Sequence, residues 1–245
     1  ELYVIDLLKP ILIDVFSSGD SWYSNKFLHE QEELLKAIIA KSPEVGFSFI
    51  LDIYKTVIDE NKDESYLEEI KSPLYKCSKF IDGFSSKEDA HIVVEDLLVK
   101  HLKSEFQNSN YILQFFDEHK NSNSIDIIRL ILLTFKNEKV RYIDSVYELI
   151  GIVNTKNGFN GYDDKFQLYF RQVIGQYFSR FSLEQKEKVT EILLSVKSPY
   201  DFKYYKYEND EGREKVNFYG ISKKQFLFIK QLPKVEIWQI PTLKK

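Results

Sequence analysis

A helical period of apolar residues between Asp163 and Val196 constrains the fold most strongly. From Phe166 to Phe181 the apolar side chains recur at steps of three and four residues, which places them on one face of a helix. Residues 182–185 then form a Ser-x-x-Gln capping box that can begin a second helix. Two helices with one apolar face each cannot cover both faces completely, so further helices must pack against them. The sequence therefore predicts a stack of helices.

The same signals recur along the chain and predict roughly ten helices with short polar connections. Gly occurs 9 times and Pro 6 times in 245 residues, so few residues interrupt helices. Pro10 is expected to kink the first helix or to mark its boundary. The expected helices cover residues 2–16, 25–40, 43–57, 72–81, 86–106, 111–116, 125–135, 140–153, 163–181, 183–196 and 222–232.

The pattern changes after residue 199, where aromatic residues are interleaved with charges and show no clean helical or strand period. Exposed aromatic rings beside cations suit partner recognition or stacking on nucleic-acid bases. The alternative is a long ordered loop whose aromatics pack onto the helices. We therefore expect a helical-repeat array over 1–199, with an aromatic-rich loop, a short helix and a tail over 200–245 packed on its end. The candidate partner-binding residues are Tyr204, Tyr205, Tyr207 and Arg213.

No catalytic, cofactor-binding or metal-binding residues are predicted. The chain has no Walker A loop, no Gly-x-Ser-x-Gly elbow and no Gly-x-Gly-x-x-Gly loop. His91 and Glu95 are four residues apart, as are His101 and Glu105, but a zinc site needs three or four ligands. We interpret these histidines as exposed helix residues. Cys77 lies between lysines, which can lower a thiol pKa, yet a buried structural cysteine is the favoured interpretation.

Charge and composition favour a helical protein of the cytoplasm. The formal net charge is −4 and the basic residues are spread along the chain, which argues against a dedicated nucleic-acid surface but leaves room for a local patch. No apolar run of about 18 residues is present, so no membrane span is expected. A single cysteine fits a reducing compartment. Because methionine is absent, even at position 1, the chain is expected to be an excised piece of a longer protein; the alternative is that methionines or loops are missing from the written sequence.

The segment from Ile127 to Pro233 resembles the helical-repeat region of large bacterial STAND-type NTPases of antiphage defence. The resemblance is carried by residues 166–171 (FQLYFR), 177–185 (YFSRFSLEQ), 192–199 (ILLSVKSP) and 228–233 (FIKQLP). It implies a sensor or scaffold region that contacts a foreign or partner protein. The nucleotide-binding motifs of that family do not occur here, so the resemblance implies no ATPase activity for this chain.

We therefore predict an all-α protein, an irregular HEAT-like α-solenoid of antiparallel helix pairs. The first functional hypothesis is a non-catalytic protein-recognition or scaffold module. The second is a nucleic-acid-binding helical-repeat protein, which requires basic residues gathered on one concave face. The third is an enzyme with a pocket between helices, which requires convergent polar groups with perturbed pKa values.

Overall fold

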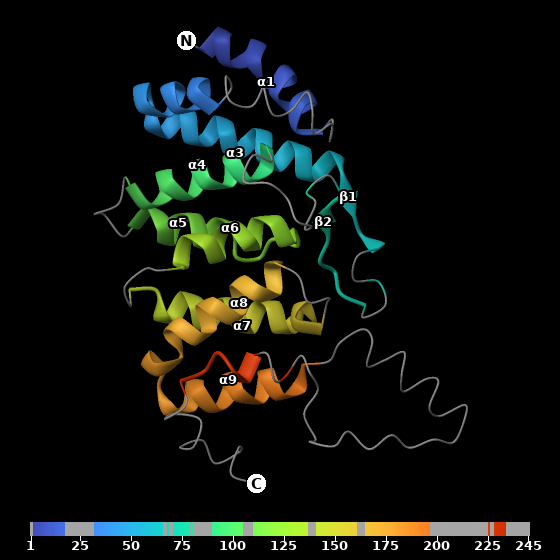
Figure 1. Ribbon diagram of the computed structural model, residues 1–245, viewed down its shortest axis with the longest axis vertical. Coiled ribbons are helices and arrows are strands. Elements are labelled where there is room, and N and C mark those ends of the chain that lie inside the picture. The colour runs from blue at the N-terminus through green and yellow to red at the C-terminus, as the bar shows by residue number, and fades with distance from the viewer. Residues whose placement is uncertain are drawn as a thin grey trace. The chain divides into compact units, whose positions relative to one another are not determined.

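The computed structural model is predominantly helical, as the sequence predicts for an all-α protein (Figure 1). In the part of the chain that it describes, the only strands are a two-residue antiparallel pair, β1 (Lys62–Asp63) and β2 (Lys76–Cys77). No helix in this part is long and apolar enough to span a bilayer. The described residues are 2–17, 32–65, 68, 71–78, 80, 90–104, 110–136, 141–160, 165–196, 225 and 228–233.

The chain divides into two compact units. Unit 1 comprises Glu1–Tyr66 and Tyr75–Thr134, and unit 2 comprises Leu67–Leu74 and Phe135–Lys245. In unit 1, α3 packs against α1, α4 and β2, and α4 packs against α5. Residues 32–41 are also helical. The helices of unit 1 are α1 (Leu2–Ser17), α3 (Pro43–Glu60), α4 (Ala90–Ser104), α5 (Asn110–His119) and α6 (Ile125–Phe135), whose last residue belongs to unit 2.

Helix α3 carries much of the core of unit 1. Its buried side chains recur with a helical period, and they include Phe47, Ile50 and Tyr54. Gly46 lies on the same helix, where an added Cβ would come within 2.8 Å of the backbone Cα of Ile39. Only glycine therefore permits this close approach of α3 to the helical residues 32–41.

The prediction of a helix over 72–81 is wrong for its described residues, because tertiary hydrogen bonds hold the backbone extended there. β2 pairs with β1, and the Tyr75 carbonyl accepts from the backbone N–H of Ile125 at 2.9 Å. The backbone N–H of Cys77 donates to the Asp126 carboxylate at 2.7 Å. These partners come from distant parts of the sequence, so local helix signals could not reveal them.

Helix boundaries set by capping side chains agree closely with the sequence. Helix α6 spans the predicted 125–135, and the hydroxyl of Ser124 accepts from the backbone N–H of Ile127 at 3.3 Å. Pro10 lies inside α1 and does not end it. Ser42 precedes α3 as predicted, but its side chain makes no capping hydrogen bond.

Unit 2 is built around α7 (Ile143–Thr155), which packs against both α8 (Lys165–Tyr177) and α9 (Leu183–Ser195). The predicted helix over 163–181 is α-helical only to Tyr177 and continues as the 3₁₀ turn η3 (Phe178–Arg180). The capping box of α9 is confirmed. The hydroxyl of Ser182 accepts from the Gln185 N–H at 3.2 Å, and the Gln185 side chain accepts from the Ser182 N–H at 2.9 Å.

A cluster of phenylalanine rings fills the core of unit 2. Phe159, in the 3₁₀ turn η2 (Gly158–Asn160), contacts Phe170 of α8 edge-on at 4.9 Å and Phe228 at 5.7 Å between ring centroids. Residues 228–233 approach α8 so closely that a Cβ on Gly175 would lie 2.7 Å from the backbone oxygen of Gln231. The chain near residue 230 is therefore fixed against α8.

Candidate functional site

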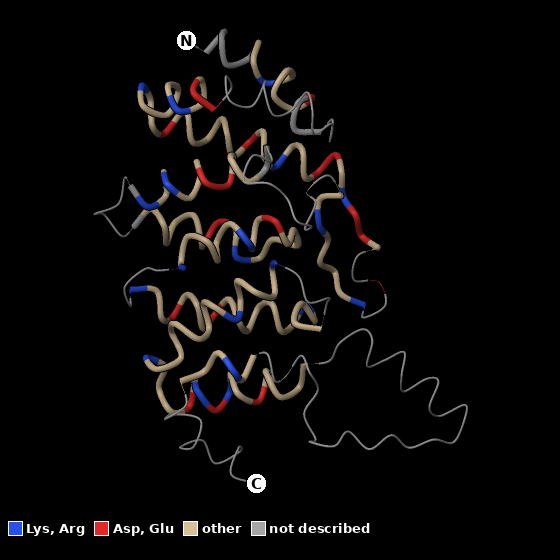
Figure 2. The backbone as a smooth tube through the Cα atoms, viewed as in Figure 1, with Lys and Arg blue, Asp and Glu red and all other residues tan. Residues whose placement is uncertain are grey.

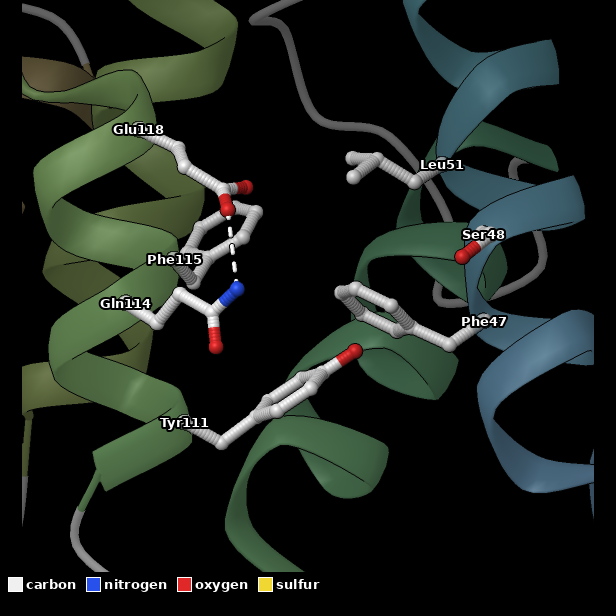
Figure 3. A pocket seen from close by; sticks show the side chains of 7 residues that line it. All are labelled: Phe47, Ser48, Leu51, Tyr111, Gln114, Phe115 and Glu118. Atoms are coloured by element: carbon white, nitrogen blue, oxygen red, sulfur yellow. Dashed lines mark hydrogen bonds between the residues drawn. The ribbon is translucent and has the colours of Figure 1, made fainter.

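A pocket of about 220 Å³ lies between α3 and α5 of unit 1 (Figure 3). Small-molecule sites commonly have volumes of about 300–1,000 Å³, so this pocket suits a smaller group, such as one side chain of a partner. Its lining combines apolar and hydrogen-bonding side chains. They are Phe47, Ser48 and Leu51 from α3, and Tyr111, Gln114, Phe115 and Glu118 from α5.

Helix periodicity brings these residues to the two facing walls. On α5, Tyr111, Phe115 and Glu118 follow one another at steps of four and three residues, and Gln114 is three residues after Tyr111. On α3, Phe47 and Leu51 are four residues apart. Each wall is therefore formed by one face of one helix.

Ring contacts hold the aromatic side of the pocket in place. The Phe47 ring stacks on His101 of α4, with 4.9 Å between ring centroids, and meets the ring edges of Tyr111 at 5.9 Å and Phe115 at 6.1 Å. The rings of His101 and Tyr111 also contact each other, at 6.5 Å. Phe47, Phe115 and His101 are buried. The aromatic wall is thus part of the core of unit 1 and has little freedom to rearrange.

The polar side of the pocket is centred on Glu118. The side-chain N–H of Gln114 donates to one Glu118 carboxylate oxygen at 3.0 Å, and both residues are exposed. In Figure 3 the second carboxylate oxygen points from α5 toward α3, and the Gln114 carbonyl oxygen faces the Tyr111 end of the pocket. Ser48 adds a hydroxyl from α3. The pocket therefore offers several hydrogen-bond acceptors beside aromatic rings.

His119 lies next to the pocket wall, where its ring meets the edge of Phe115 at 4.6 Å. Burial lowers the pKa of His119 below its ordinary value, and the positive charge of Lys55 lowers it further. The imidazole is therefore neutral near pH 7, and it places no positive charge beside the Glu118 carboxylate.

A second polar cluster in unit 1 is fully enclosed. Arg129 of α6 bridges the carboxylates of Glu95 on α4 and of Asp126 on α6, the latter at 3.2 Å. The Tyr54 hydroxyl donates to Glu95 at 2.6 Å, and burial together with the Glu95 charge raises the Tyr54 pKa well above its usual range. Asp126 also accepts from the N–H of Cys77. Because each carboxylate of this buried cluster pairs with Arg129 and accepts a hydrogen bond from a second donor, we interpret the cluster as structural.

The structure resolves some of the residue-level predictions. The interpretation of Cys77 as a buried structural thiol is confirmed, because the side chain is buried in β2. The interpretation of His101 as an exposed helix residue is wrong, because it stacks on Phe47 in the core. The side chain of His91 and residue Glu105 lie outside what the structure describes. So do all four candidate partner-binding residues, Tyr204, Tyr205, Tyr207 and Arg213.

The sequence alone predicted neither the α3–α5 pocket nor the enclosed charge cluster around Arg129. The spacing of Tyr111, Phe115 and Glu118 shows that one face of α5 mixes aromatic and polar residues. Nothing in the sequence indicates that α3 supplies the opposite wall. Over the described residues, no group of three or more His, Cys, Asp and Glu side chains has the arrangement of a metal site.

Comparisons of the chain with family models, with curated proteins and with solved structures found no match.

Proposed function

We propose that this chain is a non-catalytic protein-recognition module that seats a partner's side chain in the α3–α5 pocket. The observation that carries this proposal is the pocket itself: aromatic rings fixed in the core, hydrogen-bonding groups at the rim, and a volume near 220 Å³. Protein interfaces draw most of their binding energy from a few anchor side chains that fill such pockets. The shallow rim then contributes selectivity through hydrogen bonds.

The lining residues favour recognition over catalysis. General acid–base catalysis uses titratable groups whose environments differ strongly. Among the lining side chains Glu118 is the only carboxylic acid, and it already accepts a hydrogen bond from Gln114. This composition supports binding over proton transfer.

The charge distribution disfavours a nucleic-acid ligand at this pocket. The Glu118 carboxylate repels phosphates, whereas nucleic-acid sites neutralise them with Lys and Arg. Figure 2 shows basic and acidic residues interleaved along individual helices, as in α9, where Glu187 and Glu191 flank Lys188. Nucleic acid is therefore the less favoured ligand. That alternative predicts binding that weakens steeply as the salt concentration rises.

We also propose an architecture for the whole chain and a role for it within a larger protein. Packing of α3 on α4, of α4 on α5 and of α7 on α8 supports an irregular HEAT-like solenoid over 1–199, with 200–245 as an aromatic-rich loop, a short helix and a tail. The resemblance of 127–233 to STAND-type NTPases supports a scaffold in a larger cytoplasmic defence protein. Small-angle scattering tests the shape, because a compact domain of this length has a radius of gyration of about 18 Å and a solenoid a clearly larger one.

Selection of short random peptides on the full chain tests the recognition role. Ser48→Trp places a large ring in the pocket from an exposed position of α3, and it should abolish binding of the selected peptides. Lys188→Trp adds the same ring to an exposed position of α9 and should leave binding unchanged. Circular dichroism confirms that both variants are folded. If no peptide is selected, or if both variants bind equally well, the recognition role of this pocket is refuted.

A further inference from the structure

The hydrogen-bonding groups of the α3–α5 pocket include several acceptors. Glu118 presents a carboxylate, Gln114 a carboxamide oxygen and Ser48 a hydroxyl oxygen. The Gln114 N–H groups are partly used, because one of them donates to Glu118. A ligand that fills this space must therefore bring donors, since desolvating the carboxylate without a new partner is unfavourable.

We propose, on the basis of the recognition role above, that the pocket binds the guanidinium group of an arginine in a basic segment of the partner. A guanidinium carries five N–H donors in one plane and is always charged. Its edge meets the Glu118 and Gln114 oxygens, while its face lies on the aromatic wall of Phe47 and Phe115. Both contacts are attractive, the first as a charge-assisted hydrogen bond and the second as a cation–π interaction.

The geometry favours arginine over the other side chains of this size. A lysine ammonium has three donors and no flat face, so it cannot use the rings and the separated acceptors together. A phenylalanine or leucine fits the aromatic wall but leaves Glu118 facing an apolar group. Lys55 lies one turn further along α3, but this cation does not line the pocket. On the α5 side, Lys120 is paired with Asp117 at 2.9 Å.

The test uses the peptides whose binding is lost in Ser48→Trp. These peptides should contain arginine, and replacing that arginine with citrulline, which keeps the shape but removes the charge, should weaken binding about tenfold or more in fluorescence anisotropy. Replacement with lysine should weaken binding by a smaller factor. Pocket-dependent peptides without arginine, or a change of less than about twofold on citrulline replacement, would overturn the arginine assignment while leaving the recognition role standing.

Glu118→Gln supplies the matched change on the protein. The variant keeps the side-chain shape and an oxygen that can accept from Gln114, so the fold of unit 1 is preserved. It should weaken the arginine peptides by about tenfold and leave the citrulline peptides unchanged, so that the two substitutions are not additive. Equal affinity of wild type and Glu118→Gln for the arginine peptides would show that the carboxylate does not recognise the guanidinium. Absence of any Ser48→Trp-sensitive peptide refutes the recognition role instead, so the two failures are distinguishable.

Discussion

Replacing Arg129 with methionine tests whether the enclosed charge cluster stabilises unit 1. The side chain of Arg129 is 4% exposed, and its guanidinium bridges the carboxylates of Glu95 and Asp126, whose side chains are 8% and 2% exposed. Methionine fills much of the same volume but cannot pair with either carboxylate. Two buried negative charges would therefore remain without their cation.

The expected loss in the free energy of unfolding is about 3–5 kcal/mol, the usual cost of removing one partner of a buried ion pair. Other hydrogen bonds limit the damage to each carboxylate. Glu95 still accepts from the Tyr54 hydroxyl, and Asp126 still accepts from the Cys77 N–H. A typical hydrogen bond to a charged group contributes about 1.5–3 kcal/mol, so these bonds cannot replace the missing positive charge completely.

Urea denaturation followed by circular dichroism measures the loss, and hydrogen–deuterium exchange on peptides from α4 and α6 assigns it to unit 1. The control is Lys188→Met, which removes a pair between side chains that are 62% and 55% exposed and should change stability by less than about 0.5 kcal/mol. A loss below about 1 kcal/mol for Arg129→Met would refute the argument, because it would mean that the carboxylates find water or other partners.

A second substitution distinguishes the stability lost through packing from the stability lost because a buried carboxylate has no cation. Glu95→Gln removes one negative charge but keeps the oxygen that accepts from Tyr54. The double variant Arg129→Met with Glu95→Gln should therefore be more stable than Arg129→Met alone, with a coupling of about 1–3 kcal/mol. If the losses of the two single variants simply add, the cost comes from packing and not from the unpaired carboxylate.

Three further predictions follow from local geometry. Ser182→Ala removes the α9 cap and should cost about 1 kcal/mol in urea denaturation. Gly175→Ala should cost about 1–3 kcal/mol, because its Cβ would lie 2.7 Å from the Gln231 backbone oxygen, whereas Gly151→Ala meets nothing within 4 Å and should stabilise α7 by about 0.5–1 kcal/mol. Burial and the Lys55 charge hold the His119 pKa below 6.5, so the unfolded chain takes up this proton first and stability falls as pH drops through the unfolded pKa. His119→Gln should remove that part of the pH dependence, at most about 1.4 kcal/mol per pH unit, and an unchanged profile between pH 8 and 5 would contradict it.

The parts of the fold that the sequence predicts well are those controlled by neighbouring residues. The bounds of α6 follow from Ser124, which caps the helix, and from an apolar run that ends at Phe135. The start of α9 follows from the Ser182–Gln185 capping box. In both cases the physical cause and the effect lie within four residues, so a single sequence is sufficient.

Features that depend on distant residues were not predictable in the same way. The segment at Cys77 is extended because β1 and Asp126, far away in the sequence, satisfy its backbone groups. Glu95 shows the same limit: its spacing from His91 suggests a shared helix face, yet the carboxylate is buried against Arg129. The α3 wall was expected as a helix, and so was the α5 wall as far as residue 116, short of Glu118. The pairing of the two walls follows from packing through α4, which no local pattern records.

No described side chain of helix α4 lines the pocket, yet α4 positions both walls. Glu95 accepts from Tyr54 and so ties α4 to α3, and His101 contacts both Phe47 of α3 and Tyr111 of α5. These contacts are formed on folding, so a ligand need not order the walls when it binds. Preorganisation of this kind reduces the entropic cost of association, and a pocket for one side chain needs that saving most, because few contacts are available to offset the cost. The enclosed charges and the aromatic stack therefore hold the walls of this small pocket in place before any ligand binds, as the proposed recognition role requires.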